Sequence, residues 1–139
     1  MDEIQNYSYF EHGADIGITG KGKTLEKSFE AAAVAMFAIV TDISKVNPVK
    51  RIKFNFTEPD IEFAFISWLN NLLNESHLSN MVFSRFHVER DKDVWMCEAF
   101  GESWHSGLER GTEVKGATLT KLSVINENGI WAASCVVDV

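Results

Sequence analysis

Proline and cysteine are scarce in this sequence of 139 residues, which contains two of each. Two prolines exclude a proline-rich linker, and we find no internal repeat or low-complexity segment. Two cysteines are too few for a disulfide scaffold, and Cys97 and Cys135 each lie in an apolar run typical of a strand. We expect both to be reduced core thiols, with a bridge between adjacent strands as the alternative.

Basic residues and long apolar runs are also in short supply. Thirteen Lys and Arg against twenty Asp and Glu give a net charge of −7, which argues against tight, unaided binding to nucleic acid. The longest apolar run, residues 31–40, is about half as long as a bilayer-spanning helix. The polar, acidic start at residues 1–6 does not resemble a secretory signal. These features predict a cytoplasmic protein with no membrane contact.

Periodic patterns predict two helices and several strands. An apolar stripe predicts a helix over 25–40 with Thr24 as its N-cap, and a second stripe begins after Asp60 and continues to Leu73. Alternating or apolar runs predict the strands, and Asn128-Gly129 indicates a tight hairpin turn. The predicted strands cover residues 7–11, 16–19, 50–57, 81–89, 94–101, 118–125 and 130–137.

This order of elements predicts one α+β domain over residues 1–139. We expect a two-layer sandwich in which a largely antiparallel sheet carries two amphipathic helices on one face. A doubly wound parallel fold needs more helices than the sequence supplies.

One segment imitates a nucleotide-binding motif. Residues 17–24 match the P-loop pattern G-x-x-x-x-G-K-[ST], in which backbone amides and the lysine, here Lys23, bind phosphates. The context is wrong, because a P-loop needs a parallel βαβ core and the downstream sequence predicts antiparallel hairpins. We interpret residues 17–24 as a strand and a polar turn that lead into a capped helix.

Acidic groups near the two ends of the chain suggest a cation site. Asp138 and the terminal carboxylate of Val139 close an apolar strand, and Asp15 follows a turn near the other end. If the three groups meet, they offer the oxygen ligands that a hard divalent cation prefers. The alternative is that Asp138 is a solvated strand end. His12 either stabilises its turn or takes part in binding, and Lys115 is either functional or an ordinary strand-edge lysine.

Several segments in order resemble the archease family. They are Tyr9–Ile18 with its H-G-A-D-I-G block, Gly22–Glu26 before an Ala-rich helix with Met36-Phe37, Thr41-Asp42, Trp68–Asn70, Gly111–Lys115 and the closing Val137–Val139. The family pattern has Ser or Thr where this sequence has Gly13. It often has Tyr-His where this sequence has Leu119-Thr120.

The resemblance implies a non-catalytic protein that activates an RtcB-type RNA ligase in tRNA splicing or RNA repair. It promotes guanylylation of the ligase and multiple turnover. It also implies a divalent metal site formed by Asp15, Asp138 and Val139, with calcium the usual ion and magnesium or manganese as alternatives. Lys115 is implied as functional. The alternatives are a chaperone-like modulator of a tRNA methyltransferase and, from the pattern around Lys23, a small nucleotide hydrolase.

Overall fold

The computed structural model describes residues 6–139; the polar start of the sequence at residues 1–5 lies outside the described residues. No helix in residues 6–139 is long and apolar enough to cross a membrane. The elements follow in the order β1 (Tyr7–His12), β2 (Asp15–Gly22), α1 (Leu25–Val40), the 3₁₀ helix η1 (Ile43–Lys45), β3 (Lys50–Thr57), α2 (Ile61–Ser79), β4 (Met81–Asp91), β5 (Val94–Ser103), β6 (Gly116–Ala117), β7 (Ser123–Glu127) and β8 (Ile130–Asp138).

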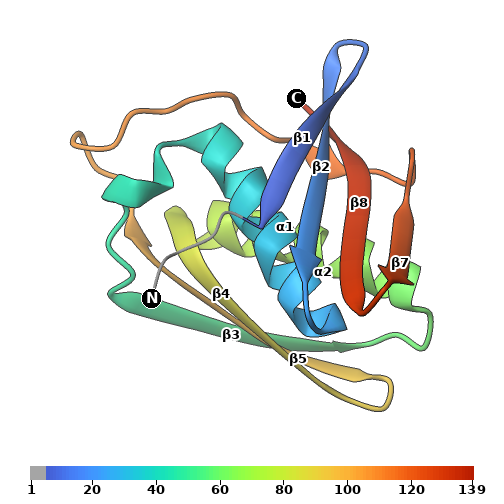
Figure 1. Cartoon of the computed structure of the whole chain (residues 1–139). Helices are drawn as coiled ribbons and strands as arrows, with labels where there is room; N and C mark the ends of the chain where they lie inside the picture. Colours follow the sequence, from blue (N-terminus) through green and yellow to red (C-terminus); the bar gives the residue numbers. More distant parts are fainter. Residues whose placement is uncertain (1–5) are drawn as a thin grey trace.

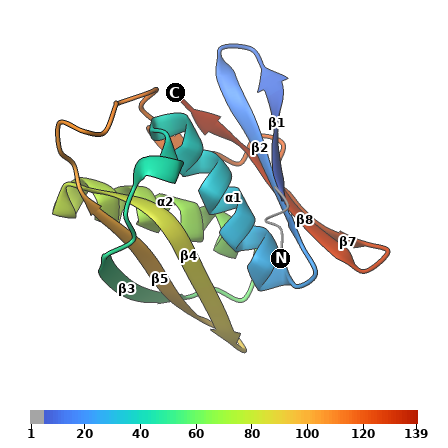
Figure 2. The same ribbon diagram turned by 60° about the vertical axis from the view of Figure 1, so that its left-hand side comes forward.

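The strands form two antiparallel sheets with both helices between them (Figures 1 and 2). The five-stranded sheet has the order β1-β2-β8-β6, and β7 also pairs with β8. The three-stranded sheet has the order β3-β5-β4. The predicted α+β class, with two helices and antiparallel strands, is confirmed.

The layering differs from the expected single sheet with both helices on one face. Helix α1 contacts β2 and β8 of one sheet and β4 of the other. Its buried residues combine the small Ala32, Ala33 and Ala35 with the large Phe29 and Phe37. Small side chains allow close approach to one neighbour while large rings fill the space toward another, so α1 is covered from two sides.

Both helices begin at the predicted caps. The Thr24 side chain accepts a hydrogen bond from the amide of Lys27, and the Asp60 carboxylate accepts two from the first turn of α2. These bonds satisfy amides that lack a partner inside the helix. Helix α2 continues past Leu73, where the predicted stripe stops, and ends at Asn80 in the left-handed conformation.

Two of the hairpin turns contain residues that tolerate positive φ angles. Asn128 (φ 54°) and Gly129 (φ 85°) form the predicted turn between β7 and β8, as in a type I′ hairpin. Gly13 (φ 60°) is the first of the two residues that join β1 to β2. Ser or Thr at that position would adopt this angle less readily than glycine.

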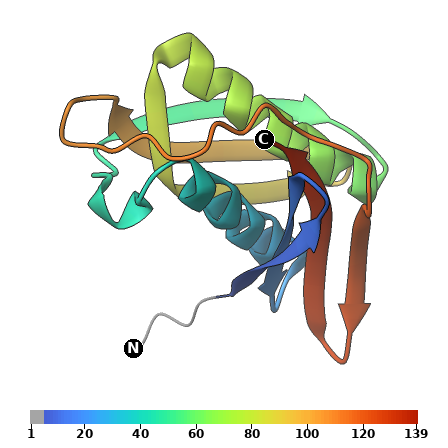
Figure 3. The same ribbon diagram turned by 90° about the horizontal axis from the view of Figure 1, so that it is seen from above.

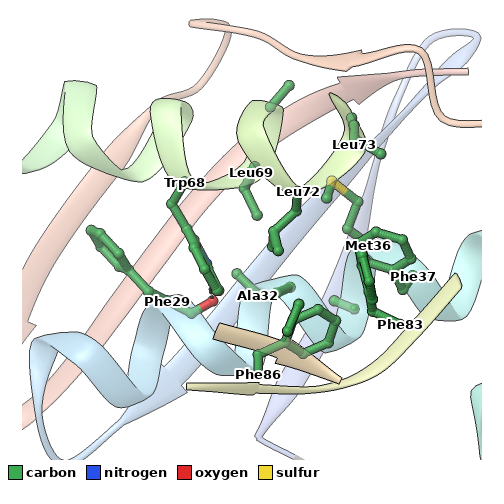
Figure 4. Packing of buried hydrophobic residues seen from close by; sticks show 14 of the residues in the cluster. Phe29, Ala32, Met36, Phe37, Trp68, Leu69, Leu72, Leu73, Phe83 and Phe86 are labelled. Carbon is green, nitrogen blue, oxygen red and sulfur yellow. Dashed lines mark hydrogen bonds between the residues drawn. The ribbon is translucent and has the colours of Figure 1, made fainter. Parts of the chain in front are cut away.

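The core surrounds the two helices and includes buried residues of both sheets. Figure 4 shows Trp68 and Leu72 of α2 pointing toward α1, with Phe83 and Phe86 of β4 closing the far side. The fully buried indole of Trp68 donates its N–H to the carbonyl of Phe29 at 2.8 Å. This bond links the two helices and satisfies the indole's only donor.

Both cysteines are free and buried, as the sequence predicted. Cys97 lies in β5 and Cys135 in β8, which belong to different sheets. Burial raises the pKa of each thiol to about 12, because a thiolate is poorly solvated in an apolar interior. They act as small apolar core residues.

Gly20 sets the distance between β2 and α1. A Cβ at this position would lie 2.2 Å from the amide nitrogen of Ala32 and 2.4 Å from the carbonyl oxygen of Ser28. These are backbone atoms of α1, so the clash cannot be relieved by a side-chain rotation.

We predict that Gly20→Ala lowers the free energy of unfolding by about 3 kcal/mol or more, because β2 and α1 must separate. Gly116→Ala is the matched control, since its Cβ would meet only the Asn70 side-chain oxygen at 3.6 Å. Urea denaturation followed by tryptophan fluorescence measures both variants. Equal stability of the two would contradict this account of the contact.

Candidate metal-binding and partner-binding site

The pairing of β2 with β8 brings the start of β2 beside the end of the sequence (Figure 1). Ile16 lies opposite Val137, so Asp15 and Asp138 are the next residues on the two strands. The amide of Val139 donates to the Asp15 carboxylate at 3.2 Å. The structure therefore brings together the three residues for which the sequence suggested a cation site.

His12 belongs to the same row of residues. It lies opposite Asp15 in the register between β1 and β2. Side chains alternate along a strand, and the buried Val137 faces the interior, so Asp138 faces solvent. Asp138 is exposed, whereas Asp15 and His12 are half-buried. We call His12, Asp15 and Asp138, together with Val139, the chain-end row.

Among residues 6–139, no basic side chain is paired with the carboxylates of the row. Within residues 6–139, neither Asp15 nor Asp138 forms an ion pair, and the His12 ring makes no hydrogen bond. The His12 ring therefore does not stabilise its turn by a hydrogen bond. Two neighbouring carboxylates repel one another, and a cation bound between them relieves this repulsion.

Lys115 reaches the row through its backbone. Its amide donates to the Asp138 carbonyl at 2.8 Å, and the next residue, Gly116, pairs with Asp138 across β6 and β8. The Lys115 side chain is exposed and forms no ion pair within the described part of the chain. A free ammonium group and the acidic row thus occupy the same end of the five-stranded sheet.

The connection from residue 104 to 115 crosses the carboxyl ends of the helices before it reaches the row (Figure 3). The amides of Gly111 and Thr112 donate to the carbonyls of Val40 and Ile39, at 2.7 and 3.0 Å. A Cβ on Gly111 would lie 2.7 Å from the Ile39 oxygen, so the close approach needs glycine. These bonds satisfy free carbonyls at the end of α1 and fix the path toward Lys115.

Asn70 also positions this segment; it belongs to the Trp68–Asn70 block of the resemblance, but sequence reasoning assigned it no role. The Asn70 side-chain amide accepts from the Ala117 amide at 2.9 Å and donates to the Ala117 carbonyl at 3.2 Å. This pair of bonds attaches β6 to α2. In the sequence, Asn70 follows Leu69 at the border of the apolar stripe of α2. A polar residue at such a position is ordinarily interpreted as facing solvent.

The metal site implied by the resemblance has few protein ligands. Among residues 6–139, no three His, Cys, Asp or Glu side chains gather closely enough to hold a metal ion. The donors at the row are the carboxylates of Asp15 and Asp138 and the oxygens of Val139. All are hard oxygen donors, which fit a calcium, magnesium or manganese ion and leave coordination positions open.

The P-loop imitation is part of a strand. Residues 17–20 pair with both β1 and β8 inside the five-stranded sheet, residues 21–22 pair with β8, and Lys23 and Thr24 form the turn into α1. Amides of a paired strand are already bonded to neighbouring strands. They are not free to surround a phosphate as the amides of a P-loop do.

The segment that departs from the family pattern lies beside Val136, near the carboxyl end of β8. The Thr118 amide and hydroxyl donate to the Val136 carbonyl, and the Val136 amide donates to the Thr120 carbonyl. The Leu119 side chain between them is 60% exposed. Leu119 offers no donor atom, and Thr120 offers a hydroxyl in place of the imidazole of the family pattern.

The fold and the row define a small α+β protein in which paired carboxylates meet where two antiparallel strands end. The family model described as the Archease protein family (MTH1598/TM1083) matches residues 7–139. This chain belongs to the archease family.

Named relatives and solved structures agree with this assignment. The chain is 35% identical to the protein archease of Sulfurisphaera tokodaii, over 98% of this chain and 100% of that protein. It is 34% identical to the protein archease of Methanosarcina mazei, over 97% of both. The solution structure of Methanobacterium thermoautotrophicum protein 1598 superposes with a TM-score of 0.88 at 31% identity, covering 98% of this chain and 100% of that one.

A more distant structure shares the fold alone. The crystal structure of a Thermotoga maritima archease, described as a possible chaperone, has a TM-score of 0.65 at 18% identity and covers 94% of both chains.

We predict that Asp15→Ala releases the end of the chain, because the Val139 amide loses its acceptor. Hydrogen exchange of this amide should accelerate by about fivefold, which corresponds to about 1 kcal/mol. Asp15→Asn is the matched control, since its carbonyl oxygen still accepts the bond without the charge. Unchanged exchange in Asp15→Ala would show that the bond does not hold the chain end.

Proposed function

We propose that this protein is a non-catalytic, divalent-metal-binding activator of an RtcB-type RNA ligase, which promotes guanylylation of the ligase and multiple turnover. The observation that carries the proposal is the meeting of Asp15, Asp138 and Val139 at one edge of the fold. Membership in the archease family supports it.

The coordination at the row suits a helper protein better than a self-contained metalloenzyme. Two carboxylates and the Val139 oxygens leave positions that water or phosphate oxygens of a partner complex can complete. Magnesium and manganese are commonly bound by one or two carboxylates together with phosphates, whereas calcium takes six to eight oxygens. An open site of this kind favours magnesium or manganese as the working ion. When bound, the ion supplies positive charge beside a phosphate group.

The charge of the molecule supports docking at a ligase. A protein that binds RNA presents Lys and Arg to the phosphates, so its cleft is basic. This chain has a net charge of −7, and the row is an exposed edge rather than a buried pocket. Attraction between an acidic edge and a basic cleft speeds association and fixes orientation.

Lys115 complements the carboxylates in this arrangement. Its backbone bond to Asp138 fixes the segment, while its ammonium group forms no ion pair within residues 6–139 and is available to an anion of the partner. A lysine at this position acts as a point charge toward phosphate or carboxylate.

A second candidate function is a chaperone-like modulator of a tRNA methyltransferase. The description of the Thermotoga maritima archease as a possible chaperone favours this class. Identification of the main partner by affinity capture distinguishes it from the ligase proposal. A cytoplasmic location remains a prediction in either case.

We predict that Asp138→Ala keeps the fold and reduces stimulation of a cognate RNA ligase by at least about tenfold, because an exposed ligand of the ion is lost. Ligation and ligase guanylylation, measured with GTP and manganese with and without the protein, check this. Glu127→Ala removes an exposed carboxylate from β7 and serves as the control. Full stimulation by Asp138→Ala, with an unchanged melting temperature, would falsify the proposal.

A further inference from the structure

The outer face of the three-stranded sheet carries a basic cluster in a protein that is acidic overall. The helices contact this sheet from one side, and no helix or strand of the described chain lies over the other (Figures 1 and 2). Phe100 of the central strand β5 lies between Arg51 of β3 and Arg85 of β4 in the sheet register. Lys53 is the next outward-facing residue on β3.

These four residues, Arg51, Lys53, Arg85 and Phe100, form what we call the sheet patch. The three basic side chains are exposed and the Phe100 ring is half-buried. The Arg85 guanidinium carbon lies 5.5 Å from the centre of the Phe100 ring. The ring and the guanidinium thus provide neighbouring flat surfaces of the kind on which nucleic-acid bases stack.

The lysine next to the patch in the sequence faces the other way. Lys50 precedes Arg51 in β3, so its side chain lies on the opposite face of the strand, and its Nζ donates to the Ser103 hydroxyl at 3.1 Å. Residues 43–53 contain four Lys or Arg and no acidic residue. The sequence as a whole has 13 basic against 20 acidic residues, so the positive charge here is a local concentration.

Acidic residues border the patch on its central strand, because Glu98 and Glu102 lie two residues before and after Phe100 on the same face of β5, and Glu98 is opposite Lys53. Glu98 pairs with Arg51 at 3.3 Å, which partly neutralises that arginine. His87 is bonded to Glu89, and Asp91 lies at the hairpin tip. Lys53 and Arg85 form no ion pair within residues 6–139, so their charges remain available to a ligand.

We propose that the sheet patch binds single-stranded nucleic acid, with Lys53 and Arg85 contacting phosphates and the Phe100 ring stacking on a base. A groove or face that combines positive charge with an exposed aromatic ring is the common arrangement in proteins that bind single-stranded nucleic acid without strong sequence preference. The negative charge elsewhere on the protein repels phosphates and confines the nucleic acid to this face. This inference goes beyond the proposed activator role and does not depend on it.

The expected affinity is modest. Binding through about three or four phosphates gives a slope of about −2 to −3 when the logarithm of the association constant is plotted against that of the salt concentration. The net charge argued against tight binding by the chain as a whole, and weak, salt-sensitive binding by one face is consistent with that argument.

Fluorescence anisotropy of a labelled oligouridylate of about ten nucleotides tests the proposal, with the purified protein and no ligase. Lys53→Gln/Arg85→Gln should weaken binding by at least about tenfold at low salt and reduce the salt slope by about 1 to 2. Lys21→Gln/Lys23→Gln removes the same charge from β2 and the turn that follows it, and should leave binding within about twofold of the unsubstituted protein.

Phe100→Leu tests stacking separately, because it keeps apolar volume and removes the flat ring. It should weaken binding by about fivefold or more at an unchanged melting temperature. Oligothymidylate in a parallel titration shows whether the ligand is RNA alone or any single strand. Absence of binding by the unsubstituted protein, or equal weakening by both lysine-containing pairs, overturns the proposal.

The ligase assay separates this inference from the proposed function. If Lys53→Gln/Arg85→Gln loses ligase stimulation although no RNA binding is detected, the patch contacts the ligase and the nucleic-acid proposal is wrong. Loss of RNA binding with intact ligase stimulation supports the nucleic-acid proposal and leaves the role of the chain-end row unaffected.

Discussion

The antiparallel pairing of β2 with β8 is the interaction on which the rest of the structure depends. It joins the first and last parts of the described chain in one sheet and places Asp15 beside Asp138. A shift of one residue in this register would turn Val137 toward solvent and Asp138 toward α1, so burial of the core fixes the register. The same requirement that buries Val137 therefore assembles the chain-end row.

Helix α1 connects the pair of β2 and β8 to the three-stranded sheet. The absence of a side chain at Gly20 allows β2 to approach the backbone of α1, and α1 also contacts β4. The free carbonyls at the end of α1 then hold Gly111 and Thr112, from which the chain reaches Lys115. The row is thus built on elements that are fixed by the core, as a site on a rigid scaffold requires. The sheet patch lies on a different sheet and is independent of this path.

Much of the fold was predictable because its signals are local. Thr24 and Asp60 cap helices at the predicted residues, and Asn128-Gly129 adopts the angles that its turn type requires. The division of the strands into two sheets was not predictable from alternation, which shows that one face is buried but not what covers it. The alanines of α1 allow it to have close neighbours on two sides. An alanine-rich stripe is also found in helices that pack against one sheet, so the sequence does not distinguish the two arrangements.

The charged residues of the site were predictable from the sequence, but the hydrogen bonds that position them were not. Asp15 and Asp138 stand out as carboxylates at strand ends, and the resemblance to archeases favoured the functional interpretation of Lys115 over that of a strand-edge lysine. The bonds from Gly111 to Val40 and from Thr112 to Ile39 join backbone groups, so no side chain in the sequence indicates them. The basic cluster of the sheet patch depends on the pairing of β3 with β5 and β4, whereas an average over the sequence gave only a net negative charge.

Line broadening by manganese in two-dimensional NMR spectra tests the account of the chain-end row most directly. Substoichiometric Mn²⁺ broadens amide resonances near its binding site, and a chelator should reverse the effect. We expect the amides of Asp15, Lys115 and Val139 to lose intensity first, while those of Lys53 and Phe100 remain sharp. Broadening centred on another acidic region, such as the turn at Asp91, or no localised broadening at all, would contradict the account.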